Sequence, residues 1–310
     1  MPFPIESKCV IAISASALFD MHDAAAIFES KGIEAYRTYQ EDNADVVLEK
    51  GAAFPFVRRL LKLNETFPEI SPIEIILLSQ NSPETGVRVF NSILHYNLNI
   101  TRAVFSSGRQ NFQYLPAFNA TIFLSANPEE TKRATKAGYT AGTVLAGRIV
   151  DDDTDDELRV AFDFDGVIVD DSAERVYQER GMSEYMSHES SLAGQPLDQG
   201  PVYNLLQKLS EFQKLEAEKQ RLDPTYTPKL ITSIVTARNA PAHQRVLTTL
   251  KNMNIQVNEL FFMGGIEKAR VLEIMKPHLF LDDQMTHLVS LKGIPAVHIP
   301  FGINNQDGTI

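Results

Sequence analysis

Two aspartates that follow an apolar run are the residues of this sequence best suited to chemistry. Residues 160–171 are VAFDFDGVIVDD, in which the first three residues predict a buried strand and Asp163 and Asp165 follow at a spacing of two. Side chains two residues apart in an extended chain point to the same side. An isolated DxD pair is also common in solvated loops. Here Gly166 allows a sharp turn and apolar residues resume, which favours a reactive carboxylate pair at the carboxyl edge of a parallel sheet.

Three further motifs in the second half of the chain place polar residues at element ends. SIVTAR ends an apolar run at Thr236, whose hydroxyl and backbone N–H suit a phosphate oxygen, although threonine is also an ordinary strand former. Lys268 opens a predicted helix. The helix dipole does not favour a cation at this end unless an anion binds there, so the position indicates an anion site. The alternative interpretation is an ordinary surface lysine. LFLDDQ ends in Asp282 and Asp283. Adjacent carboxylates repel each other, so we expect a Mg²⁺ site there rather than a solvated turn.

The elements that would position these residues alternate between strands and helices. Predicted strands cover residues 9–18, 73–79, 103–105, 120–124, 160–163, 230–235, 260–262 and 279–281. Predicted helices cover residues 23–31 (ended by Gly32), 54–63, 87–96, 131–137, 173–180, 202–221, 242–253 and 267–275. This alternation predicts an α/β fold of the Rossmann-like kind with a mainly parallel sheet. Residues 170–200 are too few for a large cap domain, so we expect a small helical flap.

The two halves of the sequence align with each other over long blocks. The shift is 149 residues in the first blocks and 157 after an extra loop near residues 211–226. Chance similarity between two α/β halves is one explanation, and duplication of one α/β unit is the one we favour. Identical pairs include Gly32 with Gly181, Tyr36 with Tyr185, Arg88 with Arg245 and Asn97 with Asn254.

Under this alignment every charged candidate site residue in the second half of the chain aligns with a neutral residue in the first half. We therefore predict a degenerate domain over residues 1–150, which keeps the fold without the chemistry, and a catalytic domain over residues 159–310. The acidic run DDDTDDEL at 151–158 is expected to be an exposed linker, because like charges repel; a metal-binding role is the alternative. The counterparts are Ser14 for Asp163, Ser16 for Asp165, Ser79 for Thr236, Asn111 for Lys268, Ser125 for Asp282 and Ala126 for Asp283.

Composition limits the classes of function. With 310 residues and 44% hydrophobic content, the chain is long enough for two domains with real cores. Its formal charge of -11 argues against general nucleic-acid binding, and its single cysteine, Cys9, fits a reducing compartment. Residues 10–19 could be taken for the core of a signal peptide, but they also fit the opening strand of the first repeat. We expect a cytoplasmic protein without a membrane span and leave open whether it forms a homo-oligomer.

The ordered motifs DFDGV, VTAR, EKAR and FLDDQ resemble those of the haloacid dehalogenase superfamily of phosphotransferases. More narrowly, the chain resembles the cytosolic 5'-nucleotidase I family over nearly its whole length, in segments such as SASALFDM, AFPFVRRL, GVRVFNSILHYNL, QPLDQGP, VTARNAP and LFLDDQMTHLV. Its first motif departs from the more usual DGDAV but keeps both aspartates. The resemblance implies a Mg²⁺-dependent phosphoric monoester hydrolase that converts nucleoside 5'-monophosphates such as AMP to nucleoside and phosphate.

The resemblance also implies roles for the motif residues. Asp163 would be the nucleophile that forms an aspartyl-phosphate, and Asp165 the general acid and base. Thr236 and Lys268 would hold phosphoryl oxygens. Mg²⁺ would be bound by Asp163, the backbone carbonyl of Asp165, and Asp282 with Asp283; the sequence leaves open which of the last two is the direct ligand.

Some alternatives stay open at the level of sequence. Arg238 could assist catalysis or cap the following helix. A phosphatase for another small phosphate ester and a non-enzymatic nucleotide-sensing protein are the competing functions. A sensor would have no need of two aspartates, a threonine and a lysine together, so the sequence favours the enzyme.

Overall fold

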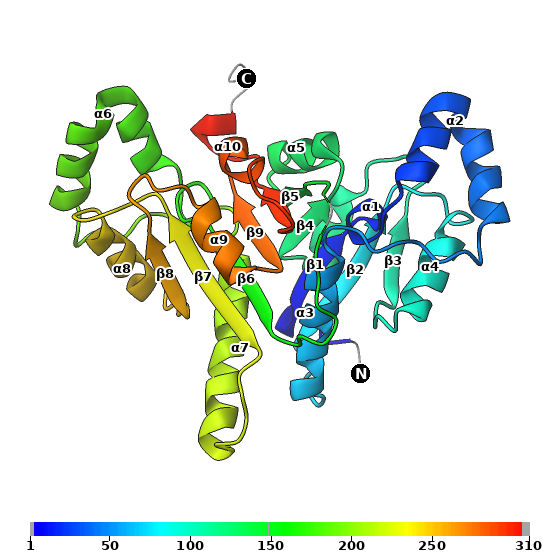
Figure 1. Cartoon of the computed structure of the whole chain (residues 1–310), viewed down its shortest axis with the longest axis horizontal. Helices are drawn as coiled ribbons and strands as arrows, with labels where there is room; N and C mark the ends of the chain where they lie inside the picture. Colours follow the sequence, from blue (N-terminus) through cyan, green and yellow to red (C-terminus); the bar gives the residue numbers. More distant parts are fainter. Residues whose placement is uncertain (1–2, 148, 306–310) are drawn as a thin grey trace. The chain divides into compact units, whose positions relative to one another are not determined.

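The computed structural model describes residues 3–147 and 149–305, and the chain divides into two compact units, Met1–Ala146 and Gly147–Ile310. Each unit is an α/β structure with a parallel sheet (Figure 1). The central strands of each unit are buried along almost their whole length, as expected for parallel strands covered by helices on both faces, whereas the outer strands at residues 102–105 and 259–262 are not fully buried. The predicted α/β class with a mainly parallel sheet is confirmed.

In the first unit the strand order is β3-β2-β1-β4-β5. The strands are β1 (Cys9–Ile13), β2 (Ile73–Ser79), β3 (Arg102–Phe105), β4 (Ile122–Ser125) and β5 (Ala141–Val144). The helices are α1 (Ala15–Leu18), α2 (His22–Asp42), α3 (Phe54–Thr66), α4 (Gly86–His95) and α5 (Pro128–Lys136), with short 3₁₀ turns at Ile5–Ser7 and Phe112–Phe118.

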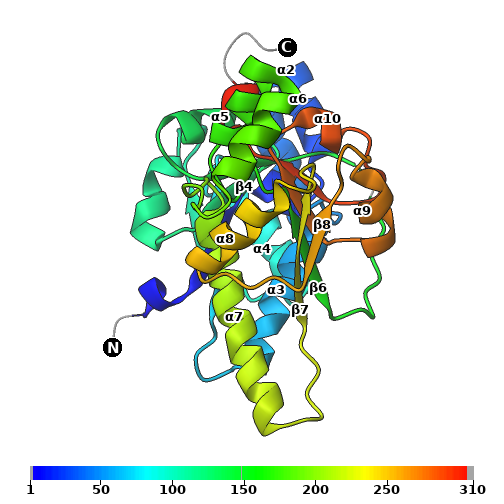
Figure 2. The ribbon, with the colours of Figure 1, turned by 90° about the vertical axis from the view of Figure 1, so that its left-hand side faces the viewer.

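In the second unit the strand order is β8-β7-β6-β9-β10. The strands are β6 (Leu158–Phe162), β7 (Leu230–Thr236), β8 (Glu259–Phe262), β9 (Leu279–Asp282) and β10 (Ala296–His298). The helices are α6 (Ser172–Ser191), α7 (Tyr203–Leu222), α8 (His243–Asn252), α9 (Ala269–Met275) and α10 (Met285–Leu288), with a 3₁₀ turn at Ile303–Asn305. Figure 2 shows α7 and α8 on one face of this sheet and α9 on the other.

The strands of the two units have the same order, and their registers correspond at the residues compared below. Cys9 pairs with Ile73 in the first unit, as Leu158 pairs with Leu230 in the second. The pair Ile11 and Ile122 likewise corresponds to Val160 and Leu279. Each of these correspondences follows the shifts of 149 and 157 seen in the sequence.

The predicted helix ends at Gly32 and Arg180 are not ends in the structure. Gly32 has φ +80° and Gly181 has φ +79°, so the backbone makes a sharp turn at each glycine and then resumes helical geometry, to Asp42 in α2 and to Ser191 in α6. A residue without a Cβ adopts this left-handed region without steric cost. The glycine therefore kinks each segment.

The segment predicted as one strand over residues 9–18 contains a strand and a helix. β1 ends at Ile13, and α1 starts after Ser14, whose side chain accepts a hydrogen bond from the backbone N–H of Ala17. This bond satisfies an N–H group that the first helical turn leaves without a partner. The apolar residues after Ser14 continue the buried run, which is why the sequence pattern alone extended the strand.

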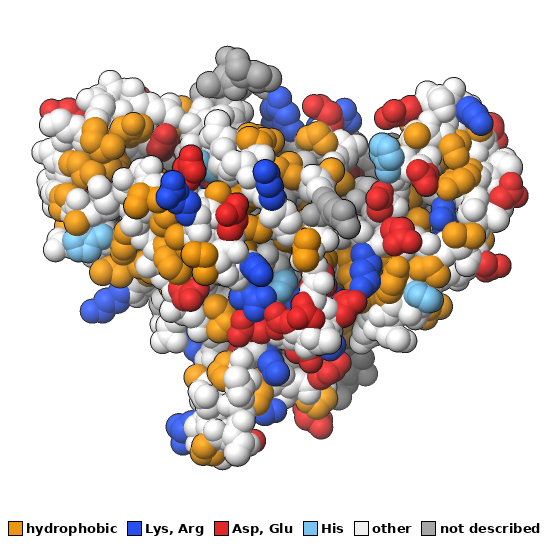
Figure 3. Space-filling view, viewed as in Figure 1, with side chains coloured by type: hydrophobic (Ala, Val, Ile, Leu, Met, Phe, Trp, Pro, Cys, Tyr) orange, Lys and Arg blue, Asp and Glu red, His pale blue; other side chains and the backbone are white. Residues whose placement is uncertain are grey.

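The surface carries both signs of charge. On the face shown in Figure 3, basic side chains lie among acidic ones. Among the described residues, every helix is too short or too polar to cross a membrane.

Candidate active site

Three strands of the second unit end side by side and carry the predicted site residues. In the central strand β6, Phe162 pairs with Ile234 of β7 on one side and with Leu281 of β9 on the other. Because parallel strands end at the same edge, the residues that follow are brought together there. Asp163 follows β6, and Thr236 and Asp282 are the last residues of β7 and β9.

Lys268 joins two of these aspartates directly. Its Nζ atom lies 2.8 Å from Oδ1 of Asp163 and 2.7 Å from Oδ2 of Asp282. All three side chains are almost fully buried. Burial disfavours the ammonium group, but the two carboxylates outweigh that effect and raise the pKa of Lys268. Lys268 is therefore a charged bridge inside the site and not a surface lysine.

The pKa values of Asp163 and Asp283 are both raised. Burial, followed by the charge of Asp282, raises the pKa of Asp163 to about 7, although Lys268 opposes the shift. Burial and the charges of Asp163 and Asp282 raise the pKa of Asp283 to about 8. The Oδ2 atom of Asp283 accepts a hydrogen bond of 3.1 Å from Asn304, whereas its buried Oδ1 atom has no hydrogen-bond partner among the described residues.

These carboxylates fit a divalent cation. Asp163, Asp282 and His287 each offer one ligand atom, and these atoms lie within 4.8 Å of one another. The charges of Asp163 and Asp282 also act on Asp283, whose buried Oδ1 atom has no hydrogen-bond partner among the described residues. Mg²⁺ prefers oxygen ligands of this kind, and its charge would relieve the repulsion that raises the two pKa values. The sequence reasoning missed His287, which contacts Asp282 at 3.0 Å from the first turn after LFLDDQ.

The backbone of Gly166 packs closely against the side chain of Asp283. The φ of Gly166 is +71°, and a Cβ atom added to this glycine would lie 2.8 Å from Cγ of Asp283. We therefore expect Gly166→Ala to lower the free energy of unfolding by about 1–3 kcal/mol, because it adds both backbone strain and a steric clash.

A matched control separates these two effects. Gly181 has φ +79°, but a Cβ atom there meets nothing within 4 Å, so Gly181→Ala adds backbone strain alone. Chemical denaturation of both variants should show the larger loss for Gly166→Ala. Equal losses would mean that the contact with Asp283 contributes nothing.

Asp165 is held by a different cation from Asp163. Arg238 donates to both of its carboxylate oxygens, from Nε at 2.8 Å and from Nη2 at 2.7 Å. Arg238 also pairs with Glu189 of α6, a fully buried carboxylate that Arg245 contacts from Nη1 at 2.7 Å. The sequence left open whether Arg238 assists catalysis or caps the following helix. In the structure its guanidinium group contacts Asp165.

Thr236 lies at the same sheet edge with its hydroxyl already engaged. Its Oγ1 atom accepts a hydrogen bond of 3.2 Å from the backbone N–H of Arg238, and the side chain is 1% exposed. The structure thus brings Asp163, Lys268 and Asp282 into direct contact, with Asp283 packed against the Gly166 turn. Thr236 and Asp165 flank that cluster.

The residues that sequence reasoning missed are mostly buried charges on helices. Glu189 has no distinguishing motif around it. Arg245 did carry a signal, since it aligns with Arg88 in the first half. Arg88 bonds Gln40, the residue aligned with Glu189, at 3.2 Å. Because the two halves align, polar residues at these two positions in both halves could have indicated the contact between Arg245 and Glu189.

The pKa shifts lead to a prediction on stability. Folding raises the pKa of Asp283 from 3.8 to about 8, so between these values the folded chain binds more protons than the unfolded chain. Stability is therefore lost as the pH rises through this window. In metal-free protein we expect Asp283→Asn to stabilise the chain relative to the unmodified chain, increasingly from pH 4 to pH 8, because the amide carries no charge.

Urea denaturation across this pH range, with a chelator present, measures the effect. The control is Asp45→Asn, which changes an exposed aspartate in the other unit. The prediction would be contradicted if the free energy of unfolding of Asp283→Asn differed from that of the unmodified chain by the same amount at every pH.

A buried lysine among aspartates at the carboxyl edge of a parallel α/β sheet lies where ligands bind in open α/β folds. The profile of the 5'-nucleotidase family matches residues 1–306. Human cytosolic 5'-nucleotidase 1B is 33% identical over 314 residues, which span 98% of this chain and 51% of that protein. No solved structure matches the chain. The chain belongs to the 5'-nucleotidase family, as its motifs indicated, and it spans about half the length of this curated relative.

Proposed function

We propose that this chain hydrolyses nucleoside 5'-monophosphates, AMP among them, to nucleoside and phosphate. The observation that carries the proposal is the buried contact of Lys268 with both Asp163 and Asp282 at the sheet edge. A cation fixed beside a buried carboxylate suits the attack of that carboxylate on an anionic phosphoryl group. Membership of the 5'-nucleotidase family supports the choice of substrate.

In the proposed mechanism Asp163 attacks phosphorus and the bond from phosphorus to the 5'-oxygen breaks. Asp165 gives its proton to the leaving 5'-oxygen and later takes a proton from the attacking water. That water breaks the aspartyl-phosphate, which releases phosphate and returns the Asp163 carboxylate. Lys268 and Thr236 hold phosphoryl oxygens, and their positions at one sheet edge support these roles.

A divalent cation completes this site in the proposal, and Mg²⁺ fits the carboxylate ligands best. Asp163, Asp283 and the backbone carbonyl of Asp165 would hold it, together with Asp282 or His287. The free Oδ1 atom of Asp283 supports its choice as a direct ligand, because both Asp282 oxygens already have partners in Lys268, His287 and the N–H of Gln284. The cation would neutralise charge between the carboxylates and the phosphate.

We further propose that α6 acts as the flap of this site. Glu189 in its second half reaches Arg238, which holds Asp165, so the position of the helix is coupled to that of the general acid. The kink at Gly181 gives the segment a natural hinge.

The first unit is, in our proposal, a degenerate haloacid-dehalogenase-like copy of the second. Matching strand order and matching registers support duplication over chance similarity. Gly32 and Gly181 share the same φ, and so do Asn97 (+52°) and Asn254 (+54°). The copy keeps the fold, with Ser14 and Ser16 in the places of the two motif aspartates.

A substrate panel tests the proposed function. Phosphate release from nucleoside monophosphates, with Mg²⁺ or with EDTA, should be highest for nucleotides with Mg²⁺ and lost with EDTA. Faster release from sugar phosphates than from any nucleotide would favour a phosphatase for another ester. Release from none of the esters would favour a sensing protein. The name of the human relative also supports a cytoplasmic location, which fractionation of cells would check.

A further inference from the structure

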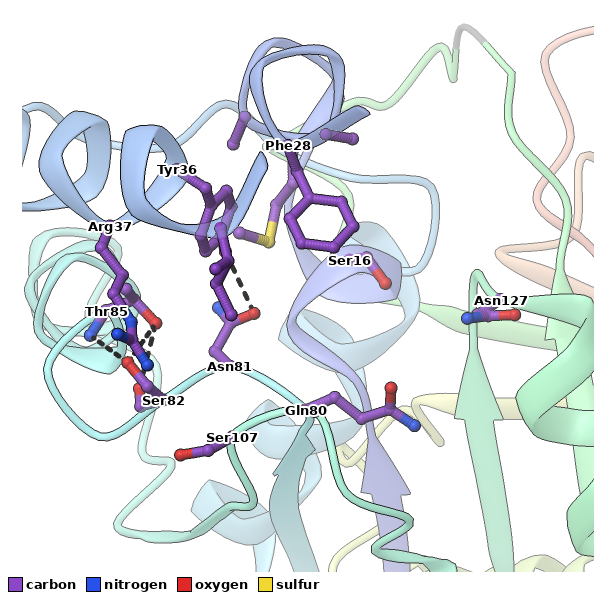
Figure 4. Close-up of a pocket in the computed structure, with 15 residues that line it drawn as sticks. Ser16, Phe28, Tyr36, Arg37, Gln80, Asn81, Ser82, Thr85, Ser107 and Asn127 are labelled. Carbon is purple, nitrogen blue, oxygen red and sulfur yellow. Dashed lines mark hydrogen bonds between the residues drawn. The ribbon is translucent and has the colours of Figure 1, made fainter. Parts of the chain in front are cut away.

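The first unit contains a cavity of about 380 Å³ at the carboxyl edge of its sheet. Phe28 and Tyr36 of α2 line one side (Figure 4), and Ile33 of the same helix also lines the cavity. Gln80 and Asn81, which follow β2, line the opposite side. This volume lies in the range of small-molecule sites, which are typically apolar with a few polar groups that fix the ligand.

The cavity exists because small neutral residues stand where the second unit has charged ones. Ser16 aligns with Asp165, and Asn81 aligns with Arg238. In the second unit Arg238 reaches Asp165 and Glu189 and lies 6.0 Å from the Tyr185 ring. Asn81 is too short for such contacts, so the corresponding space in the first unit stays open.

Asn81 presents a buried donor that the protein does not use. Its Oδ1 atom accepts a hydrogen bond of 3.1 Å from the Tyr36 hydroxyl, while its Nδ2 atom is buried without a partner among the described residues. A buried donor without a partner costs about 1–3 kcal/mol, which a ligand acceptor would relieve. Phe28, 50% exposed, meets Tyr36 edge to face with ring centroids 6.0 Å apart. A flat heterocycle with polar edges matches an aromatic wall opposite amide groups.

The charges of the cavity favour an uncharged ligand over a phosphate ester. Among its described lining residues Arg37 is the one ionised side chain, and it pairs with Glu34 at 3.0 Å. Asn111 stands at the position of Lys268, so the buried cation of the second unit has no counterpart there.

We propose that this cavity is a non-catalytic binding site for a nucleoside, with the base between the α2 aromatic residues and the amide of Asn81. The choice of a nucleoside among flat heterocycles rests on the proposed function, because hydrolysis in the second unit produces one. Ser16, Gln80 and Asn127 offer hydroxyl and amide groups suited to a ribose.

The test uses the full chain labelled with ¹³C at its methionine methyl groups. Met21 lines the cavity and Met263 follows β8 in the second unit, so their signals report on different sites. Met21→Leu and Met263→Leu assign the two signals. The probes are adenosine, guanosine, cytidine, uridine and inorganic phosphate, each titrated in the presence of EDTA. At least one nucleoside should shift the Met21 signal saturably, and phosphate should not.

Two variants test the role of the free amide donor. Asn81→Asp keeps an acceptor for the Tyr36 hydroxyl but replaces the donor with an oxygen, so it should raise the Kd about tenfold or more. Asn99→Asp adds the same charge at an exposed position of the same unit and should leave the Kd unchanged. Ala25→Trp, at an exposed lining position, should fill the cavity and abolish the shift. Thermal unfolding checks that each variant is folded.

Several outcomes would overturn the inference. These are an unchanged Met21 signal with every nucleoside, a shift of Met263 alone, a Met21 shift with phosphate alone, and equal affinity in the Asn81→Asp and unmodified chains. Phosphate release from AMP is measured separately. A missing Met21 shift with intact AMP hydrolysis would overturn only this inference, whereas a Met21 shift without hydrolysis would overturn only the proposed enzyme activity.

Discussion

Asp163→Asn should lower the rate of phosphate release from AMP by about 10⁴-fold or more, because an amide cannot act as the attacking group. The substitution is nearly isosteric, and Lys268 keeps its contact with Asp282 at 2.7 Å. Removing one negative charge from a cluster that raises the pKa of Asp163 to about 7 should not unfold the chain. We therefore expect the loss to be in turnover and not in folding.

The measurement is a steady-state assay with AMP and Mg²⁺, with the melting temperature recorded in parallel. Asp45→Asn, at an exposed position of the first unit, is the matched control and should keep full activity. If Asp163→Asn retained activity within about tenfold of the unmodified chain, another group would have to be the nucleophile.

Arg238→Met should both destabilise the protein and remove most of its activity. Arg238 is the common partner of Asp165 and Glu189, and it is 3% exposed. Removing one member of a buried ion pair costs about 3–5 kcal/mol, because the remaining charges lose their compensation. Asp165 would also lose the two hydrogen bonds that fix its carboxylate, so we expect kcat to fall about 100-fold or more by loss of general acid catalysis.

Arg245→Met separates the two effects. It removes the other partner of Glu189 but leaves both hydrogen bonds between Arg238 and Asp165 intact. It should therefore lower the free energy of unfolding while changing kcat much less than Arg238→Met does. Urea denaturation and AMP turnover of the two variants give the comparison. If both variants lost equal shares of kcat, Arg238 would act through stability alone.

Corresponding positions at the sheet edges of the two units carry different charges. Ser125 in the first unit bonds Glu130 at 2.6 Å, and the residues aligned with this pair are Asp282 and His287, which are also in contact. The scaffold of contacts is thus kept while its charges differ. Exchanging aspartate and arginine for serine and asparagine leaves neutral hydrogen-bonding groups around an open cavity.

The sequence located Asp163, Thr236 and Asp282 at strand ends, because an apolar run marks where each strand stops. Apolar runs set where β6, β7 and β9 stop, and parallel strands then align their ends at one edge. Lys268 was identifiable by its unfavourable place before a helix. The predicted strand over residues 9–18 was wrong at its end, because buried strand and buried helix residues share the same apolar character.

Local pattern could not identify the partners of these residues. Glu189 is ordinary in a helical sequence, and only packing shows that it is fully buried between Arg238 and Arg245. His287 contacts Asp282 because a short helix follows the strand. Such contacts depend on distances between segments that lie far apart in the chain, and sequence periodicity carries no information on those distances.

By itself the sequence determined the α/β class, the motif residues and the family, since these follow from periodicity and from short ordered motifs. The tertiary structure alone decided which charges meet: Lys268 with Asp163 and Asp282, and Arg238 with Asp165 and Glu189. It also decided that the first unit has an open cavity where the second has an ion-pair network. The physical reason is that a charge or a hydrogen-bond donor without a partner costs much free energy only when it is buried. Burial is a property of the packed chain.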